Sequence, residues 1–166
     1  LAKSCVVMAS GDSLLAAEVV EKTRRRIVAD GAVTIEGFAE RLRDVYMACH
    51  LQRAENVVLK PRGLTLAEYH QFGSQRLPLQ MHINIDNALF NFGLGVVEFL
   101  LAGVDDTGAH LYRVYYAGMA GGDWLEWCDR LGFRAIGSGG MHASVLLALD
   151  EQRRDLPLNG TIFNLY

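Results

Sequence analysis

Residues 99–114 read FLLAGVDDTGAHLYRV, and residues 133–149 read FRAIGSGGMHASVLLAL. In the first of these pieces, apolar, β-branched and aromatic residues lie on both sides of Asp105-Asp106-Thr107-Gly108. A short polar, glycine-containing sequence between two strand-like runs is typical of a tight turn. The piece therefore predicts an antiparallel hairpin of strands over residues 96–104 and 109–116.

The second piece predicts a strand over residues 132–136, a turn at Gly137-Ser138-Gly139-Gly140 and a helix over residues 141–151. A glycine-rich turn between a strand and a helix can bind phosphate at the helix N-terminus. This turn, however, lacks the lysine and the spacing of a P-loop and has no G-x-G-x-x-G pattern. Taken alone, it indicates a tight turn whose small residues allow a close approach of the backbone.

The first third of the chain predicts one strand and two helices. Residues 4–9 (SCVVMA) are an apolar run that indicates a buried strand, stopped by Ser10-Gly11. Apolar residues then recur at spacings of three and four over residues 12–30, and again from Thr34 towards Pro61. Because each helix has one apolar stripe, we expect the two helices to pack together on one face of a sheet.

The middle of the chain, residues 60–95, is interrupted by prolines and glycines. Thr65 is a candidate N-cap for one or two helical turns over residues 66–72, and residues 80–86 (QMHINID) alternate as a strand would. A connection this long is uncommon as bare loop, so we expect part of it to be ordered. Residues 117–123 (AGMAGGD) are predicted to form a loop.

The composition indicates one domain over residues 1–166. A net charge of −3 gives no electrostatic reason to expect nucleic acid as a partner. Three widely separated cysteines argue against a disulfide framework and favour a reducing compartment. No apolar run reaches the ~20 residues that a membrane helix needs, so we expect a cytoplasmic protein with no membrane partner.

A resemblance to a known family rests on the hairpin at residues 99–114 and on AIGSGG at residues 135–140. These pieces resemble the proteasome β-subunit and the related HslV-type peptidase, which belong to the N-terminal-nucleophile (Ntn) hydrolase superfamily. The resemblance covers most of residues 4–30 and 96–150. It implies an α+β fold, the four-layer αββα sandwich, incomplete at both ends in the residues given and with an insertion at residues 60–95. It also implies a ring-forming homo-oligomer.

The activity that the resemblance implies is hydrolysis of peptide bonds in a peptide or protein substrate. The family's nucleophile is an N-terminal threonine, serine or cysteine whose own amine acts as general base. Leu1 is not such a residue, and the strands that would carry the nucleophile are expected outside the residues given. The resemblance implies no cofactor.

The same resemblance assigns roles to three residues of the two strand-to-helix turns. Ser138 would hydrogen-bond near the N-terminal amine, and a backbone amide at Ser10 or Gly11 would stabilise the tetrahedral oxyanion. Which of these two residues supplies the amide stays open, and an ordinary capped helix start explains this turn about as well. If the resemblance holds, we expect the turns at Ser10-Gly11 and Gly137-Ser138-Gly139 to meet at one edge of the sandwich.

Other chemistries are more weakly indicated. A Ser–His–Asp triad would pair Ser138 with one of five histidines, but no G-x-S-x-G elbow is present. Zinc has no convincing site, because no C-x-x-C or H-E-x-x-H motif occurs and the pairs His82/Asp86 and Glu68/His70 are isolated. The five histidines are His50, His70, His82, His110 and His142.

A second function class is a non-catalytic subunit that uses the fold to build a ring. In this alternative the insertion at residues 60–95 and the tryptophans Trp124 and Trp127 form the contacts. Two aromatic rings three residues apart most simply cover a hydrophobic surface, either the core of this chain or a neighbouring subunit. Self-association is therefore expected under both alternatives.

Overall fold

The computed structural model describes residue 2 and residues 4–31, 33–93, 96–116, 124–130 and 133–149. In this part of the chain four strands form one antiparallel sheet in the order β1-β2-β3-β4. Their bounds are β1 Ser4–Gly11, β2 Val97–Asp105, β3 Gly108–Val114 and β4 Leu125–Trp127. The predicted hairpin is confirmed as β2 and β3, and the predicted first strand forms as β1. The expected burial of that strand is wrong: no residue of β1 is buried, because β1 is an edge strand of the described sheet.

The turn of the hairpin forms for a local reason. Asp105 Oδ1 accepts hydrogen bonds from the Thr107 amide (2.8 Å) and the Thr107 hydroxyl (2.6 Å). An aspartate that bonds the backbone two residues ahead mimics a backbone turn. Gly108 follows with a φ of +134°, a conformation that residues with a side chain rarely adopt. The strands on either side then pair without a gap from Asp105 opposite Gly108 to Phe99 opposite Val114.

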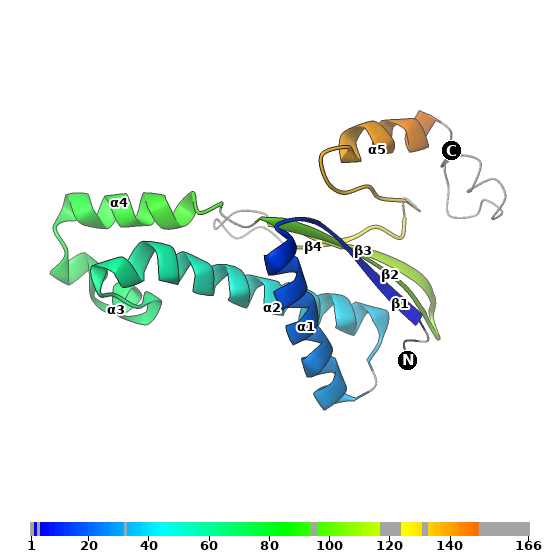
Figure 1. Cartoon of the computed structure of the whole chain (residues 1–166), viewed down its shortest axis with the longest axis horizontal. Coiled ribbons are helices and arrows are strands. Elements are labelled where there is room, and N and C mark those ends of the chain that lie inside the picture. Colours follow the sequence, from blue (N-terminus) through cyan, green and yellow to red (C-terminus); the bar gives the residue numbers. More distant parts are fainter. Residues whose placement is uncertain are drawn as a thin grey trace.

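Helices α1 (Ser13–Asp30) and α2 (Ile35–Ala54) cover one face of the sheet (Figure 1). Asp12 caps α1 and Thr34 caps α2. The two predicted helices and their common face are therefore confirmed. The core between this layer and the sheet contains Leu15, Val19, Leu42, Val45, Tyr46, Phe99 and Val114. Trp124 joins it and is buried, whereas Trp127 is exposed.

Residues 55–90, which contain most of the predicted insertion, fold as a helical lobe. After α2 the chain makes one π-helical turn, Glu55–Leu59, and a short 3₁₀ turn, Lys60–Arg62. Helices α3 (Leu66–Arg76) and α4 (Leu79–Phe90) follow. The lobe has a hydrophobic cluster of its own, formed by Ala54, Val58, Leu59, Tyr69, Ile85, Leu89 and Phe92. The prediction of ordered structure here is confirmed, including Thr65 as the cap of α3.

The strand predicted over residues 80–86 is wrong, because this segment lies inside α4. The alternation in QMHINID is real, but Ile85 and Leu89 are four residues apart and both are buried in the lobe. A helix places such residues on one face, and the packing partners are the helical segments that precede it. The tertiary surroundings therefore override the local pattern.

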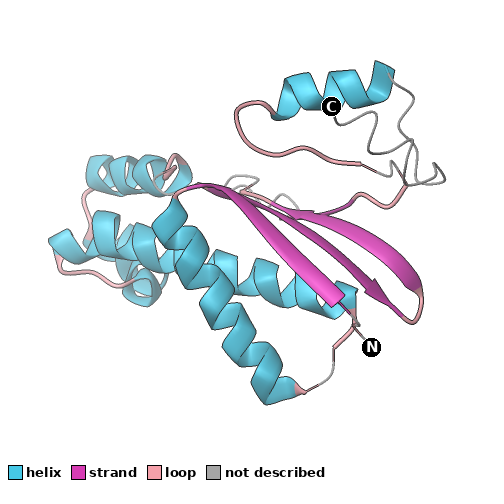
Figure 2. Cartoon of the chain, turned by 45° about the vertical axis from the view of Figure 1, so that its right-hand side comes forward, coloured by secondary structure: helices cyan, strands magenta, loops and turns pink. Residues whose placement is uncertain are grey.

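Helix α5 (Gly140–Leu149) lies on the other side of the sheet from α1 and α2 (Figure 2). Its start confirms the predicted last helix, and residues 150–151 of that prediction lie outside the described residues, as does the predicted loop 117–123. The strand predicted at residues 132–136 is not formed over residues 133–136, and residue 132 lies outside the described part. A strand needs a neighbour to accept its hydrogen bonds, and the described sheet ends at β4.

The fold class is therefore α+β, with five α-helices and one antiparallel sheet in the described residues. Cys5, Cys49 and Cys128 are all free thiols. No helix in the described residues has both the length and the apolar character needed to cross a membrane.

Candidate functional site

The two turns singled out in the sequence meet at one end of the sheet. Ser10 is the second-last residue of β1 and lies opposite Glu98 of β2. Gly137, which precedes α5, packs so closely on Ser10 that a Cβ atom at Gly137 would lie 2.5 Å from the Ser10 Oγ. The expected convergence of the turns is confirmed by this contact. The catalytic roles given to Ser10, Gly11 and Ser138 stay predictions.

Glycine is required on both sides of the contact. Gly11 has a φ of +115°, and a Cβ atom there would lie 2.3 Å from the Val96 carbonyl oxygen. Gly137 has a φ of +84° in addition to its contact with Ser10. Both conformations disfavour any residue with a side chain. The close contacts with Val96 at Gly11 and with Ser10 at Gly137 therefore restrict the backbone of each turn.

Glu98 contacts both turns: it lies opposite Ser10 in the sheet, and its carboxylate bonds the Gly137 amide. Its Oε2 accepts a hydrogen bond from the Gly137 amide at 3.1 Å, although the two residues are 39 positions apart. Its Oε1 accepts from Arg113 Nη2 at 2.5 Å. Arg113 Nη1 and Arg134 Nη2 both donate to Glu126 Oε2, at 3.2 and 2.7 Å. An alternating row of two carboxylates and two guanidinium groups therefore lies on the face of the sheet that turns away from α1 and α2.

The surroundings keep Glu98 ionised. Burial has the largest single effect on its pKa and raises it, since a charge is less stable away from water. The Gly137 amide and the Arg113 guanidinium, with Arg134 behind them, favour the charged form. Together they outweigh burial, so the pKa of Glu98 lies below its ordinary value.

Sequence reasoning missed Glu98 and Arg113. The only signal was one of position: both are charged residues in strands that are otherwise mostly apolar. Side chains alternate between the faces of a strand, so Glu98 and Arg113 point to the face opposite the buried Phe99 and Val114. No local sequence pattern indicates that Glu98 bonds the Gly137 amide.

Ser138 itself lies one residue beyond the contact and is exposed. None of the hydrogen bonds among the described residues joins it to a histidine, so the triad alternative gains no support. His142 is exposed in α5, and His70 is exposed in α3. The remaining three histidines have other surroundings, described next.

His50 is completely buried between the core and the lobe, among the rings of Tyr46, Phe92, Tyr116 and Trp124. Burial lowers the pKa of His50 below its ordinary value, against a smaller opposing effect of the Phe92 backbone. The imidazole is therefore neutral in the folded protein at neutral pH. Its ring therefore packs as a neutral group among these aromatic side chains.

His82 belongs to a group of hydrogen-bonded side chains that joins α3 to α4. The Tyr69 hydroxyl lies 2.7 Å from both His82 Nδ1 and Asp86 Oδ1. Burial, followed by Asp86, raises the pKa of Tyr69. Among the described residues no group of three or more histidine, cysteine, aspartate or glutamate side chains could hold a metal ion. The His82/Asp86 pair is thus a contact within the lobe.

His110 lies at the opposite end of the sheet, beside the hairpin turn. Its Nδ1 is 2.9 Å from Asp129 Oδ2, and its Nε2 is 3.2 Å from Asp105 Oδ1. Asp105 Oδ2 accepts a hydrogen bond from the amide of Ile35, the first residue of α2, at 3.1 Å. The cluster therefore ties the hairpin turn to α2 and to the chain after β4.

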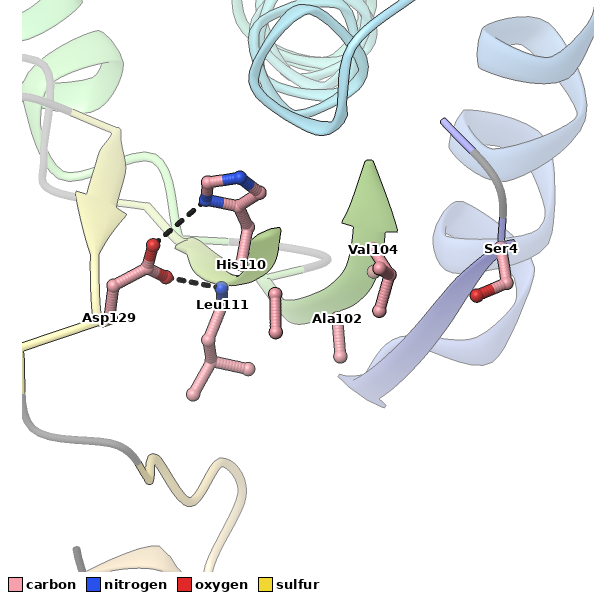
Figure 3. Close-up of a pocket in the computed structure, with 8 residues that line it drawn as sticks. Ser4, Ala102, Val104, His110, Leu111 and Asp129 are labelled. Atoms are coloured by element: carbon pink, nitrogen blue, oxygen red, sulfur yellow. Dashed lines mark hydrogen bonds and ion pairs between the residues drawn. The ribbon is translucent and has the colours of Figure 1, made fainter. Parts of the chain in front are cut away.

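A cavity of about 380 Å³ lies next to this cluster (Figure 3). Its polar rim includes Ser4, His110 and Asp129, and the rest of its lining is mainly apolar: Ala102, Val104, Ala109 and Leu111. The register places Ser4 opposite Val104 and Ser10 opposite Glu98, at the two ends of the pairing between β1 and β2. The cavity is therefore far from the turns at Ser10 and Gly137.

No known protein family matches this chain, and no curated protein matches it.

Proposed function

We propose that this chain is part of a proteasome-like Ntn hydrolase that cleaves peptide bonds with an N-terminal nucleophile. The observation that supports this most is the contact between the Ser10 and Gly137 turns. Two turns that are far apart in the chain, each followed by a helix, come together as an Ntn site requires. Helix starts aim backbone amides outward, and such amides can stabilise an oxyanion.

The proposed architecture is the αββα sandwich, in which a second sheet covers the outer face of the described one. Alternation places Val6 and Met8 on that outer face, and they are 59% and 47% exposed. Val104, on the same face, is 41% exposed. Burying one such side chain contributes about 1.5–3 kcal/mol. A layer that covers the apolar part of this face, outside the row of charged side chains, would therefore be stabilised.

Helix α5 supports the same arrangement. Apart from His142 and Ser144 its residues are apolar or glycine, and Met141, Val145, Leu146 and Leu149 are exposed. A helix that is hydrophobic all round is normally buried. Because α5 and the outer face of the sheet are on the same side of the molecule, a layer between them needs two apolar faces. A β-sheet buried on both faces meets that requirement, and its side chains would fill the cavity beside His110.

In this proposal the first residue of the covering sheet lies beside the two turns, at the place where they meet. Its hydroxyl or thiol attacks the carbonyl carbon of the scissile peptide, and its own amine takes the proton. The amide of Ser10 or Gly11 stabilises the oxyanion, and the Ser138 hydroxyl holds the amine through a hydrogen bond. The amine then returns the proton to the leaving nitrogen, and water hydrolyses the acyl-enzyme.

The test uses the full-length protein, with its N-terminus sequenced and its intact mass measured. We expect turnover of fluorogenic peptides and labelling of an N-terminal residue by a threonine-directed covalent inhibitor. Ser138→Ala should lower kcat by about 10²-fold, the effect of losing one well-placed hydrogen-bond donor. Ser144→Ala, in α5 just after the turn, is the matched control and should leave kcat unchanged. Absence of both labelling and turnover would overturn the proposal.

The alternative is a non-catalytic subunit of a ring, favoured by the apolar surface away from the turns. Trp127 at the edge strand β4 is 57% exposed. Leu79, Ile83 and Phe90 form an exposed stripe on α4. A protein that forms a closed oligomer but neither binds the inhibitor nor cleaves peptides would fit this second function.

A further inference from the structure

We propose that Glu98 is a positioning residue for Ser138: its carboxylate holds the Gly137 turn and so sets where the serine hydroxyl lies. This inference rests on the proposed function, since it assigns Glu98 to the same reaction. It adds the second residue of β2 to a site otherwise made of two turns.

The geometry of Glu98 suits this role. Residue 98 lies in the central part of the sheet order: it is opposite Ser10 of β1, and the pairing of β2 with β3 begins at the next residue, with Phe99 opposite Val114. A side chain on such a strand starts from a rigid base. From there its Oε2 reaches the Gly137 amide at 3.1 Å. Glu98 therefore contacts both turns of the proposed site, one through the sheet and one through its carboxylate.

The Gly137 turn needs a support of this kind. Gly137 has a φ of +84°, and glycine populates many conformations in the absence of contacts. Residues 133–136 before it are not paired in a strand, so the sheet ladder does not hold the turn. A hydrogen bond from an amide to an ionised carboxylate is roughly twice as strong as one between neutral groups. Glu98 is the side chain that supplies it.

Arg113 holds the side chain of Glu98 in place. Its guanidinium occupies the other carboxylate oxygen, stacks on the Tyr115 ring with Cζ 4.3 Å from the ring centroid, and pairs with Glu126. The carboxylate is thereby held in one orientation with Oε2 free for Gly137. The low pKa of Glu98 means that this arrangement persists across the neutral range.

Glu126 offers a matched control. It belongs to the same row of charges and has nearly the same side-chain exposure as Glu98, 32% against 29%. It bonds Arg113 and Arg134 but makes no hydrogen bond with Gly137 among the described residues. Glu126→Gln removes one charge from the row and leaves the turn contact intact, whereas Glu98→Gln weakens that contact and Glu98→Ala abolishes it.

The first experiment needs no activity. In ¹⁵N-labelled full-length protein, the Gly137 amide resonance should move as acid protonates Glu98, with a midpoint below the ordinary glutamate value of about 4.3. The titration should vanish in Glu98→Gln and persist in Glu126→Gln. A Gly137 titration unchanged in Glu98→Gln would overturn the inference, whatever the protein catalyses.

The second experiment measures peptide hydrolysis by the same variants. A displacement of about 1 Å in a catalytic group can cost about 10²-fold, so Glu98→Ala should lower kcat by about that factor with KM nearly constant. Glu98→Gln should recover part of the loss, and Glu126→Gln should lower kcat far less than Glu98→Ala, because the bond from Gly137 to Glu98 is kept. Equal losses in the Glu98 and Glu126 variants would overturn the positioning role. If the wild type cleaves no peptide, the proposed function fails, while the Gly137 titration still decides whether Glu98 holds the turn.

Discussion

The amide of Val97 donates a 2.9 Å hydrogen bond to the hydroxyl of Tyr46, in the fully buried space between α2 and the sheet. Val97 is the first residue of β2 and lies opposite Gly11. The bond therefore holds the end of the sheet at which Ser10 and Glu98 lie. A helix of the core thus positions the strand that carries the proposed site.

Tyr46→Phe should lower the free energy of unfolding by about 1–3 kcal/mol, because it leaves a buried amide without a partner. Urea unfolding at pH 7 measures the change. Tyr112→Phe is the control: Tyr112 is also buried, but its hydroxyl makes no hydrogen bond to another described residue. Equal effects of the two substitutions would contradict the importance of the Val97 contact.

Gly11→Ala should be far more destabilising than Gly63→Ala. Both glycines have positive φ, at which a Cβ atom costs about 1–2 kcal/mol. At Gly11 the added Cβ also meets the Val96 carbonyl at 2.3 Å, whereas nothing lies within 4 Å of the corresponding position at Gly63. The difference between the two variants in unfolding free energy therefore measures the cost of the clash with the Val96 carbonyl. Similar values for the two variants would mean that β1 and β2 can separate at Gly11 with little cost.

The buried His50 should make the protein sensitive to mild acid. Burial lowers its pKa in the folded state, while in the unfolded chain the pKa is about 6.5. As the pH falls, His50 is therefore protonated in the unfolded chain at a higher pH than in the folded protein. The free energy of unfolding should fall as the pH drops below about 6.5, by up to about 1.4 kcal/mol per pH unit. Above that pH this contribution should be constant.

The comparison that checks this is the pH dependence of urea unfolding between wild type and His50→Phe. The variant should lose part of the acid sensitivity, because phenylalanine fills the aromatic surroundings without a titrating group. His70→Gln, at an exposed position in α3, should keep the wild-type slope. Identical slopes in wild type and His50→Phe would show that His50 is protonated without penalty in the folded state.

The exposed Trp127 should take part in self-association. It lies in β4, which is the outer strand of the described sheet, and an exposed aromatic at a strand edge favours contact with another chain. We expect light scattering at high micromolar concentration to show an oligomer, and Trp127→Lys to shift it towards the monomer. Val28→Lys, an exposed apolar position on α1, should have no effect. A wild-type monomer under these conditions would exclude this contact.

Local chemistry explains which parts of the fold were predictable. The hairpin follows from Asp105, Thr107 and Gly108, whose turn closes within four residues. Helices α1, α2 and α3 follow from caps at Asp12, Thr34 and Thr65 and from apolar residues three and four apart. Helix α4 was missed because its sequence also alternates, and only the cluster around Ile85 and Leu89 separates the two patterns.

The candidate site was predictable in part. Ser10, Gly11 and Ser138 stand out because they lie in turns of small residues just before helices, and Gly11 and Gly137 do take positive φ values. The meeting of the two turns could be expected only through the resemblance to a family. Glu98 could not be found at all, since one glutamate in a strand is usually a solvated side chain.

The sequence by itself thus determined the elements whose hydrogen bonds close within a few residues: the hairpin turn, the helix caps and the glycine turns. The tertiary structure alone decided that Glu98 reaches Gly137, that His50 lies among four rings, and that α4 is a helix. These features depend on contacts between residues far apart in the chain, such as the 39 positions that separate Glu98 from Gly137. The physical reason is that a buried contact is stabilised by the groups that surround it in space, and a linear pattern does not specify those neighbours.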